Sequence, residues 1–387
     1  MSTFTPAERL NLPGYPFAEL ERRASLIRKS GRPVYNLSIG DPDLPPPSFV
    51  VEAVKRGLDE PAAHQYPSSR GDAVVRRIIA KWFKNRFNVE LDPDRQITLL
   101  VGAKEGIANI ARAVVNPGEI VAVPDPGYPV YSRAGCRFVA GTIRWLPLDP
   151  ARGFLPNLNQ APGARLVYLG YPNNPTGAVA PDSFLLDVAE LAEAHPELTV
   201  AYDMAYGEVR FDRPSRSLLE FTNRAVEFHS LSKMANATGY RVGFAAGDPD
   251  RIASLVRVKE EVDSGTPLPF QYALAAVLDS YQGTQPPAEI RKSLETFHYR
   301  KQRLTWALEH IGLEVFRSPA TFYVWFRAGD DETEFVNRAL EAGIMFTPGS
   351  AFGGQGRGWV RASVTAPDET IDQVAQIISG GIPGLKP

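Results

Sequence analysis

Hydrophobic and polar positions change period several times along the chain. Between about Ile97 and Ala246, short β-rich apolar runs alternate with stretches of helical spacing. The runs that predict strands are Ile97–Val101, Ile120–Val123, Leu166–Leu169, Thr199–Asp203, Val226–Phe228 and Val242–Ala245, and those that predict helices are Lys104–Val115, Pro181–Ala194 and Asp250–Val262. Strands that alternate with helices predict a mostly parallel sheet, of a seven-stranded type, with helices on both faces.

The pattern changes after about Pro287. A long charged helix is predicted from Ile290 to His310, and shorter strands and helices follow it: strands at Thr321–Phe326 and Val360–Ser363, and helices at Glu332–Ala342 and Glu369–Ile378. We expect a second, smaller α/β domain here, against which the first residues pack. The predicted domains are an N-terminal segment (1–45), a large domain (46–286) and a small C-terminal domain (287–387). A cleft between two lobes is a usual place for a ligand site.

Composition narrows the class of protein. With 387 residues, 44% of them hydrophobic, the chain is long enough for two lobes with substantial cores. Its formal net charge of −2 argues against a nucleic-acid scaffold. Cys136 is the single cysteine, the five histidines lack metal-ligand spacing, and no apolar run is long enough to span a bilayer. We therefore expect a cytoplasmic protein without a metal site, a membrane or a nucleic-acid partner.

One short segment gathers groups that suit a phosphate and a reactive amine. Lys233 follows the two hydroxyl residues Ser230 and Ser232, and Arg241 lies shortly after it. Hydroxyls donate hydrogen bonds to phosphate oxygens, and a guanidinium grips phosphate with two bonds. A lone lysine is almost always a solvated surface residue, so the argument for chemistry at Lys233 depends on these neighbours.

An acid and an amide follow two of the predicted strands. Asp203 ends the run Thr199–Asp203, at the edge where α/β sheets bind ligands. It is either a helix N-cap or the partner of a buried cation, such as a protonated pyridine nitrogen. Asn174 lies in the segment Tyr171–Gly177, which is a turn locally, and its side-chain donor suits a phenolate oxygen.

Four further residues suit a planar or anionic ligand. Ala103 and Lys104 follow Gly102 at a predicted helix start, where backbone N–H groups face an anion. Tyr128 is either a tyrosine packed in a turn or a ring that stacks on a flat ligand. Arg361 interrupts an apolar strand: directed inward it needs an acceptor and suits an α-carboxylate, and directed outward it is an ordinary strand cation.

These motifs, in this order, resemble the fold-type I pyridoxal-5′-phosphate (PLP) enzymes of the class I/II aminotransferase family. Tyr171–Gly177 resembles the Asn-Pro-Thr-Gly signature of that family, and Ser230–Arg241 resembles its Schiff-base lysine signature. The resemblance covers nearly the whole chain. It implies a large PLP-binding domain of fold type I and a smaller α/β domain built from both chain ends.

The resemblance also implies a role for each candidate residue. Lys233 carries the cofactor as a Schiff base and moves the substrate proton, and Arg361 and Gly40 bind the substrate carboxylate. The remaining implied cofactor contacts are Asp203 with the pyridine nitrogen, Asn174 and Tyr206 with the phenolic oxygen, Tyr128 with the ring face, and Ala103, Lys104, Ser230, Ser232 and Arg241 with the phosphate. Tyr66 resembles a tyrosine that reaches the phosphate of the neighbouring subunit, which implies a homodimer.

A finer resemblance concerns the substrate. The stretches Ile39–Pro47 and Gly14–Glu19, the second of which holds the candidate substrate contact Tyr15, resemble the group of LL-diaminopimelate, aspartate and alanine aminotransferases. Expected partners are thus a small amino acid and a 2-oxo acid such as 2-oxoglutarate or pyruvate. The alternative on the same fold is a PLP-dependent carbon–sulfur β-lyase. Ala103, where many relatives carry serine, keeps a backbone contact but not a hydroxyl.

Overall fold

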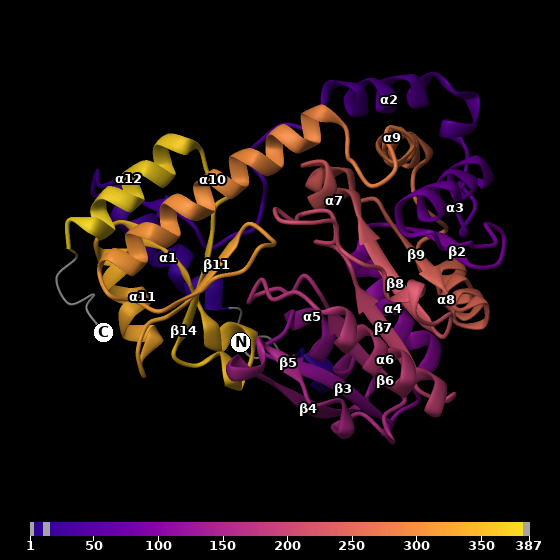
Figure 1. Ribbon diagram of the computed structural model, residues 1–387, viewed down its shortest axis with the longest axis horizontal. Helices are drawn as coiled ribbons and strands as arrows, with labels where there is room; N and C mark the ends of the chain where they lie inside the picture. The colour runs from indigo at the N-terminus through magenta and orange to yellow at the C-terminus, as the bar shows by residue number, and fades with distance from the viewer. Residues whose placement is uncertain (1–3, 11–15, 382–387) are drawn as a thin grey trace.

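A computed structural model describes residues 4–10 and 16–381 of the chain. Its largest element is an eight-stranded sheet (Figure 1). From one edge to the other the strands are β2 (Ile97–Leu100), β9 (Gly243–Gly247), β8 (Ala225–Ser230), β7 (Thr199–Asp203), β6 (Leu166–Gly170), β3 (Ile120–Asp125), β4 (Thr142–Asp149) and β5 (Leu155–Pro156). Strands β8, β7, β6, β3 and β4 are parallel, whereas β9 and the two-residue β5 run antiparallel to their neighbours. The predicted mostly parallel sheet is confirmed.

Helices cover both faces of this sheet. Alternate residues of β7 show the two sides: Val200 and Tyr202 belong to one hydrophobic core and Ala201 to another. The helices of the first face are α2 (Ser48–Asp59), α3 (Ala73–Phe87), α6 (Asp182–Ala194) and α9 (Leu268–Asp279), and those of the second are α4 (Ala103–Val114) and α8 (Pro249–Val262). Both faces of the central strands are therefore buried, as a parallel sheet requires.

Helix α4, whose N-terminus faces the site described below, is anchored to α8 by buried charges. The ammonium of Lys259 lies 3.0 Å from a carboxylate oxygen of Glu105 and 2.9 Å from one of Asp263. The lysine is fully buried, and two carboxylates satisfy it. The start of α4 is thus held in place on the sheet.

The second structural unit is built from both ends of the chain. Its four-stranded antiparallel sheet has the order β10 (Val315–Phe316), β11 (Tyr323–Arg327), β14 (Trp359–Ser363) and β13 (Thr347–Pro348). Its helices are α1 (Pro16–Lys29), α10 (Ala288–His310), α11 (Glu332–Glu341) and α12 (Asp368–Ser379), and a two-stranded parallel sheet joins β1 (Tyr35–Asn36) to β12 (Ile344–Met345). In Figure 1 the long helix α10 runs from this unit towards the large sheet.

The N-terminal segment is fixed to this unit by pairing and by charge. Leu37, in the segment after β1, is fully buried in the core of the second unit. The guanidinium of Arg300, on α10, binds Asp43 at 2.7 Å and also binds Asp368 of α12. The smaller α/β unit from both chain ends is therefore confirmed, whereas domain boundaries after residues 45 and 286 stay a prediction.

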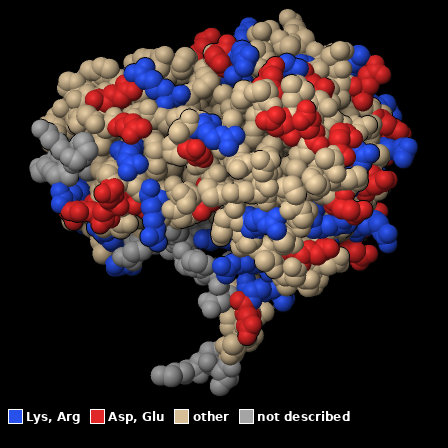
Figure 2. All heavy atoms as spheres, turned by 60° about the horizontal axis from the view of Figure 1, so that its bottom comes forward, with Lys and Arg blue, Asp and Glu red and all other residues tan. Residues whose placement is uncertain are grey.

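The surface carries charges of both signs. Figure 2 shows acidic and basic side chains interspersed over the face it presents, as the small net charge leads one to expect. Within the described residues, no helix has the length and apolar character that crossing a membrane requires.

Candidate active site

A cavity of about 790 Å³ lies at the carboxyl ends of the parallel strands, between the large sheet and the second unit. One side of the cavity consists of the segments that follow β3, β6, β7 and β8. The other side consists of loop residues 38–41 and of strands β11 and β14. Twelve predicted residues line this one cavity: Gly40, Ala103, Lys104, Tyr128, Asn174, Asp203, Tyr206, Ser230, Ser232, Lys233, Arg241 and Arg361.

Two predicted contacts are not in this group. The side chain of Tyr66 is 93% exposed and lies outside the cavity lining of its own chain. Tyr15 lies outside the described residues. Both remain predictions.

Lys233 projects into the cavity from α7 (Leu231–Met234), the short helix directly after β8. Its ammonium donates a hydrogen bond to the carbonyl oxygen of Gly40 at 2.7 Å. Burial, reinforced by the positive charges of Arg361 and Arg241, lowers the pKa of Lys233 to about 8, although Asp41 acts in the opposite direction. A lysine with this pKa exchanges a proton readily near neutral pH.

Asp203 is the last residue of β7, and each of its two carboxylate oxygens accepts a hydrogen bond. One oxygen accepts the backbone N–H of Ala205 at 2.9 Å, and the other accepts the hydroxyl of Tyr131 at 2.8 Å. Burial raises the pKa of Asp203, while these two hydrogen bonds lower it. The carboxylate caps a turn at Ala205 rather than a helix, and it lines the cavity. Its pairing with a buried cation stays a prediction.

One end of the cavity is built for an anion. Helix α4 begins after Gly102, and no side chain caps its N-terminus. The hydroxyl of Ser232 is buried in the cavity wall without a hydrogen-bond partner. The guanidinium of Arg241 approaches Gly102 so closely that a Cβ atom there would lie 2.5 Å from Nη2. Backbone N–H groups, a spare hydroxyl and a guanidinium together suit a phosphate.

Arg361, on β14, faces inward and is 5% exposed. Its guanidinium donates to the side-chain oxygen of Asn174 at 2.8 Å and to the carbonyl oxygen of Ser38 at 2.7 Å. The rings of Tyr323 and Phe352 lie 4.2 Å and 4.6 Å from its Cζ atom. The Nε atom is buried without a hydrogen-bond partner, so the guanidinium retains a donor for a carboxylate.

Aromatic residues complete the wall. The hydroxyls of Tyr206 and Tyr323 lie 2.7 Å apart. The ring of Tyr128 meets that of Tyr131 edge to face, with centroids 5.7 Å apart, and the Lys104 ammonium lies 5.9 Å from the Tyr128 ring. Tyr131 and Tyr323 were not predicted as site residues. Tyr131 stands only three residues after Tyr128 in the sequence, which is the signal that would have found it.

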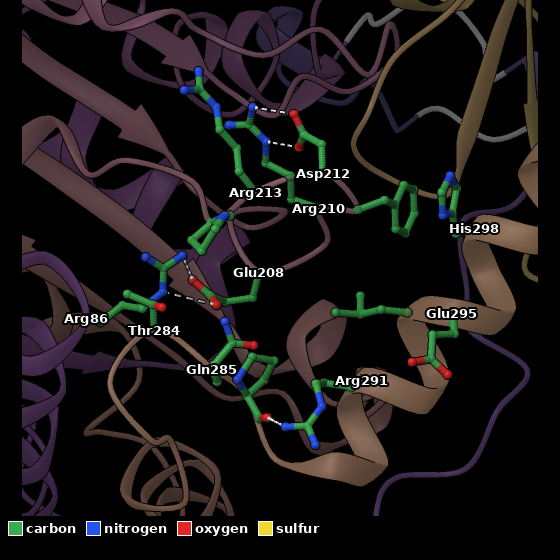
Figure 3. Close-up of a pocket in the computed structure, with 15 residues that line it drawn as sticks. Arg86, Glu208, Arg210, Asp212, Arg213, Thr284, Gln285, Arg291, Glu295 and His298 are labelled. Atoms are coloured by element: carbon green, nitrogen blue, oxygen red, sulfur yellow. Dashed lines mark hydrogen bonds and ion pairs between the residues drawn. The ribbon is translucent and has the colours of Figure 1, made fainter.

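A second cavity, of about 260 Å³, lies against the first half of α10 (Figure 3). None of the predicted site residues that the structure describes lines it. Among its charged residues, Figure 3 shows two ion pairs, Arg86 with Glu208 at 3.1 Å and Arg210 with Asp212 at 2.7 Å. Because the predicted site residues gather around the larger cavity, we place the chemistry there.

Comparison with known proteins identifies the family. Residues 32–378 match the family model of aminotransferase class I and II. The chain belongs to this family. Two relatives are LL-diaminopimelate aminotransferases: that of Aquifex aeolicus is 41% identical, covering 97% of this chain and 98% of its own, and that of Desulforudis audaxviator is 40% identical, covering 98% of each.

Solved structures agree with the family. N-succinyldiaminopimelate aminotransferase from Mycobacterium tuberculosis is 29% identical with a TM-score of 0.86, covering 97% of this chain and all of its own. Aspartate aminotransferase from Thermus thermophilus with maleate is 25% identical with a TM-score of 0.89, covering 97% and 99%. The protein is thus a transaminase of a PLP-dependent family, whose substrates are small-molecule amino acids and 2-oxo acids, and the comparisons do not favour the β-lyase alternative.

Proposed function

We propose that this aminotransferase transfers an amino group from LL-diaminopimelate to 2-oxoglutarate, with Lys233 as its catalytic residue. The observation that carries the proposal is the gathering of Lys233, Asp203 and Arg361 around one cavity, in a chain 41% identical to an LL-diaminopimelate aminotransferase. Aspartate and alanine, the other donors that the sequence suggests, are the competitors to test.

The described cavity fits PLP. Its anion-binding end has the α4 N-terminus, the unpartnered Ser232 hydroxyl and Arg241 for a phosphate. Elsewhere in the lining, the buried acid Asp203 suits a pyridine nitrogen, and the amine of Lys233 suits an aldehyde. When bound, PLP supplies an aldehyde that takes up an amine and a ring that withdraws electrons from the substrate carbon.

Lys233 acts as the proton carrier in this proposal. Its lowered pKa, about 8, leaves part of the amine neutral near pH 7, and a neutral Nζ accepts the α-proton of the substrate. After accepting it, the same atom returns the proton to the neighbouring carbon. Gly40, whose carbonyl holds Nζ at 2.7 Å, keeps the amine inside the cavity.

Asp203 and its partners hold the other end of the ring. An ionised carboxylate at Asp203 keeps a ring nitrogen protonated, because the paired charges stabilise each other in a buried site. Asn174 and Tyr206 are the proposed donors to the phenolic oxygen, and Tyr128 is the proposed stacking ring. Ala103, Lys104 and Ser230 join the phosphate contacts through the start of α4 and the end of β8.

Arg361 is the proposed binding group for the α-carboxylate of both substrates. The rings of Tyr323 and Phe352 pack against its guanidinium, and the acceptor oxygens of Asn174 and Ser38 further restrict the orientation of the guanidinium plane. A fixed planar fork pairs with a carboxylate through two parallel hydrogen bonds. Gly40 and Tyr15 remain the proposed neighbours of that carboxylate.

The assembly and the location of the protein belong to the same proposal. Tyr66 is exposed in the single chain, as expected of a residue that reaches into the cavity of a second subunit in a homodimer. A cytoplasmic location is the remaining expectation from the sequence.

A panel of amino donors tests the proposed substrate. Purified holoenzyme is given 2-oxoglutarate with LL-diaminopimelate, meso-diaminopimelate, aspartate or alanine, and glutamate formation is measured. LL-diaminopimelate should give the highest kcat/KM, and Lys233→Ala should lose more than a thousandfold of the rate. A higher kcat/KM with aspartate or alanine contradicts the proposed donor, and continuous release of ammonia without 2-oxoglutarate contradicts transamination.

A further inference from the structure

Asp125, the last residue of β3, is a buried acid outside the cavity lining. Its side chain is 7% exposed, and its two oxygens accept the backbone N–H groups of Gly354 at 3.1 Å and Gln355 at 3.0 Å. A Cβ atom at Gly353 would overlap the carboxylate, so only glycine permits this approach. Burial raises the pKa of Asp125, and the two backbone donors lower it.

The segment that Asp125 holds is part of the cavity wall. It consists of the short 3-10 helices Gly349–Phe352 and Gly354–Gly356, which lead into β14. A third hydrogen bond, from the N–H of Gly127 to the carbonyl of Phe352 at 2.9 Å, joins the same two segments. The end of β3 in the large sheet is thus joined to the loop that precedes Arg361 in the second unit.

Phe352 is the residue through which this attachment reaches the substrate site. Its ring lines the cavity and lies 4.6 Å from the Cζ atom of Arg361, and the ring of Tyr323 lies 4.2 Å from the same atom. Two aromatic rings therefore pack against the guanidinium. A guanidinium binds a carboxylate through two bonds only when its plane is correctly oriented, so displacement of Phe352 removes one of the supports that set this plane.

We infer that Asp125 is a positioning residue of this aminotransferase: by holding the N–H groups of Gly354 and Gln355 it keeps Phe352 against Arg361 and so orders the carboxylate-binding site. The inference rests on the proposed role of Arg361. Because Asp125 lies outside the cavity lining, we expect its effect to be on carboxylate affinity rather than on the proton transfer at Lys233.

The test uses holoenzyme with Asp125→Asn, which keeps the volume but turns one acceptor into a donor facing a backbone N–H. Asp92→Asn is the matched control, because Asp92 also accepts two backbone N–H groups, those of Asp94 and Arg95, away from the cavity. Amide hydrogen exchange of the peptide 349–358 is measured in each variant, together with the KM for 2-oxoglutarate and kcat. Arg361→Lys is assayed in parallel.

For Asp125→Asn we expect faster exchange in the peptide 349–358 and a KM for 2-oxoglutarate about tenfold higher, with kcat within about twofold. In Asp92→Asn, we expect hydrogen exchange in the peptide 349–358 and the KM for 2-oxoglutarate to match those of the wild type. If hydrogen exchange in Asp125→Asn is unchanged, the inference about Asp125 is wrong. It is also wrong if the KM of Asp125→Asn is unchanged while Arg361→Lys raises the KM, and in both cases the proposed role of Arg361 still stands. An unchanged KM in Arg361→Lys overturns the proposed role of Arg361 and the inference with it.

Discussion

At the scale of single residues, the site depends on an amine whose proton is easily lost. Burial and neighbouring cations lower the pKa of Lys233 to about 8, and the carboxylate of Asp41 partly offsets them. Only the neutral amine attacks an aldehyde. The rate at which apoprotein takes up PLP should therefore rise as the pH rises through about 8 and level off above it.

Absorbance during mixing of apoprotein with PLP measures this rate from pH 6 to pH 10. Asp41→Asn removes a negative charge that stabilises the ammonium, so its midpoint should lie at lower pH than that of the wild type. A rate independent of pH, or a midpoint that Asp41→Asn moves to higher pH, contradicts this account of Lys233.

The hydroxyl of Tyr131 is a second residue-scale feature with a measurable effect. It donates to Asp203 at 2.8 Å and thereby lowers the pKa of that carboxyl. In Tyr131→Phe the pKa of Asp203 should rise, the ionised fraction should fall at low pH, and kcat should drop by about tenfold. The acid limb of the kcat profile should move to higher pH.

Tyr168→Phe is the control for Tyr131. The two rings stack with centroids 4.9 Å apart, but the Tyr168 hydroxyl donates to the carbonyl of Ile107 and not to Asp203. Its acid limb should match that of the wild type. If both variants shift the limb equally, the effect comes from packing and not from the hydrogen bond to Asp203.

At the scale of elements, helix α4 begins after a glycine whose positive φ disfavours other residues, and the start of this helix is the proposed phosphate site. Gly102 has φ of +73° and faces the Arg241 guanidinium, whereas Gly118 has φ of +86° and nothing within 4 Å of a Cβ placed on it. An alanine at either position costs about 1 kcal/mol of stability, because its backbone is strained at positive φ. We expect both variants to lose about that much unfolding free energy, and only Gly102→Ala to bind PLP more weakly.

Denaturant unfolding and titration of apoprotein with PLP measure the two effects separately. Equal loss of PLP affinity in Gly118→Ala, or full affinity in Gly102→Ala, would show that the start of α4 is not the phosphate site.

The accuracy of the sequence predictions also varied by element. Helices with one apolar stripe, such as α8 and α10, were predicted within two residues of their observed bounds. Helix α9 was not predicted, because most of its residues are buried and the apolar positions therefore show no helical period. Strand β4 was missed because it lies near the sheet edge, beside the two-residue β5, and none of its first four residues is buried.

The prediction of site residues was limited in a similar way. Lys233, Asp203 and Asn174 were found because local motifs carry them, whereas Tyr323 lies in an apolar run typical of a core strand and Phe352 lies in a glycine-rich segment that indicates only a turn. Their function comes from contacts between segments far apart in sequence, such as the approach of Phe352 to Arg361. A single sequence does not contain that information.

At the scale of the whole molecule, the account requires two chains for each complete site. Tyr66 is exposed and does not line the cavity of its own chain, and it is proposed to serve that of its partner. Mixed dimers of Lys233→Ala and Tyr66→Ala chains test this directly. If Tyr66 acts across the interface, one site of the mixed dimer has both side chains, and activity should recover to about a quarter of wild type in a random mixture of chains. Activity no higher than that of Tyr66→Ala alone contradicts the shared site.

The most direct test of the whole account is to locate the covalent bond between protein and cofactor. Holoprotein prepared with excess PLP is reduced with borohydride, digested, and mapped by mass spectrometry. The account predicts one modified peptide, with the added mass on Lys233, and none in Lys233→Ala. Stoichiometric modification of another lysine, or an unmodified chain, would contradict it.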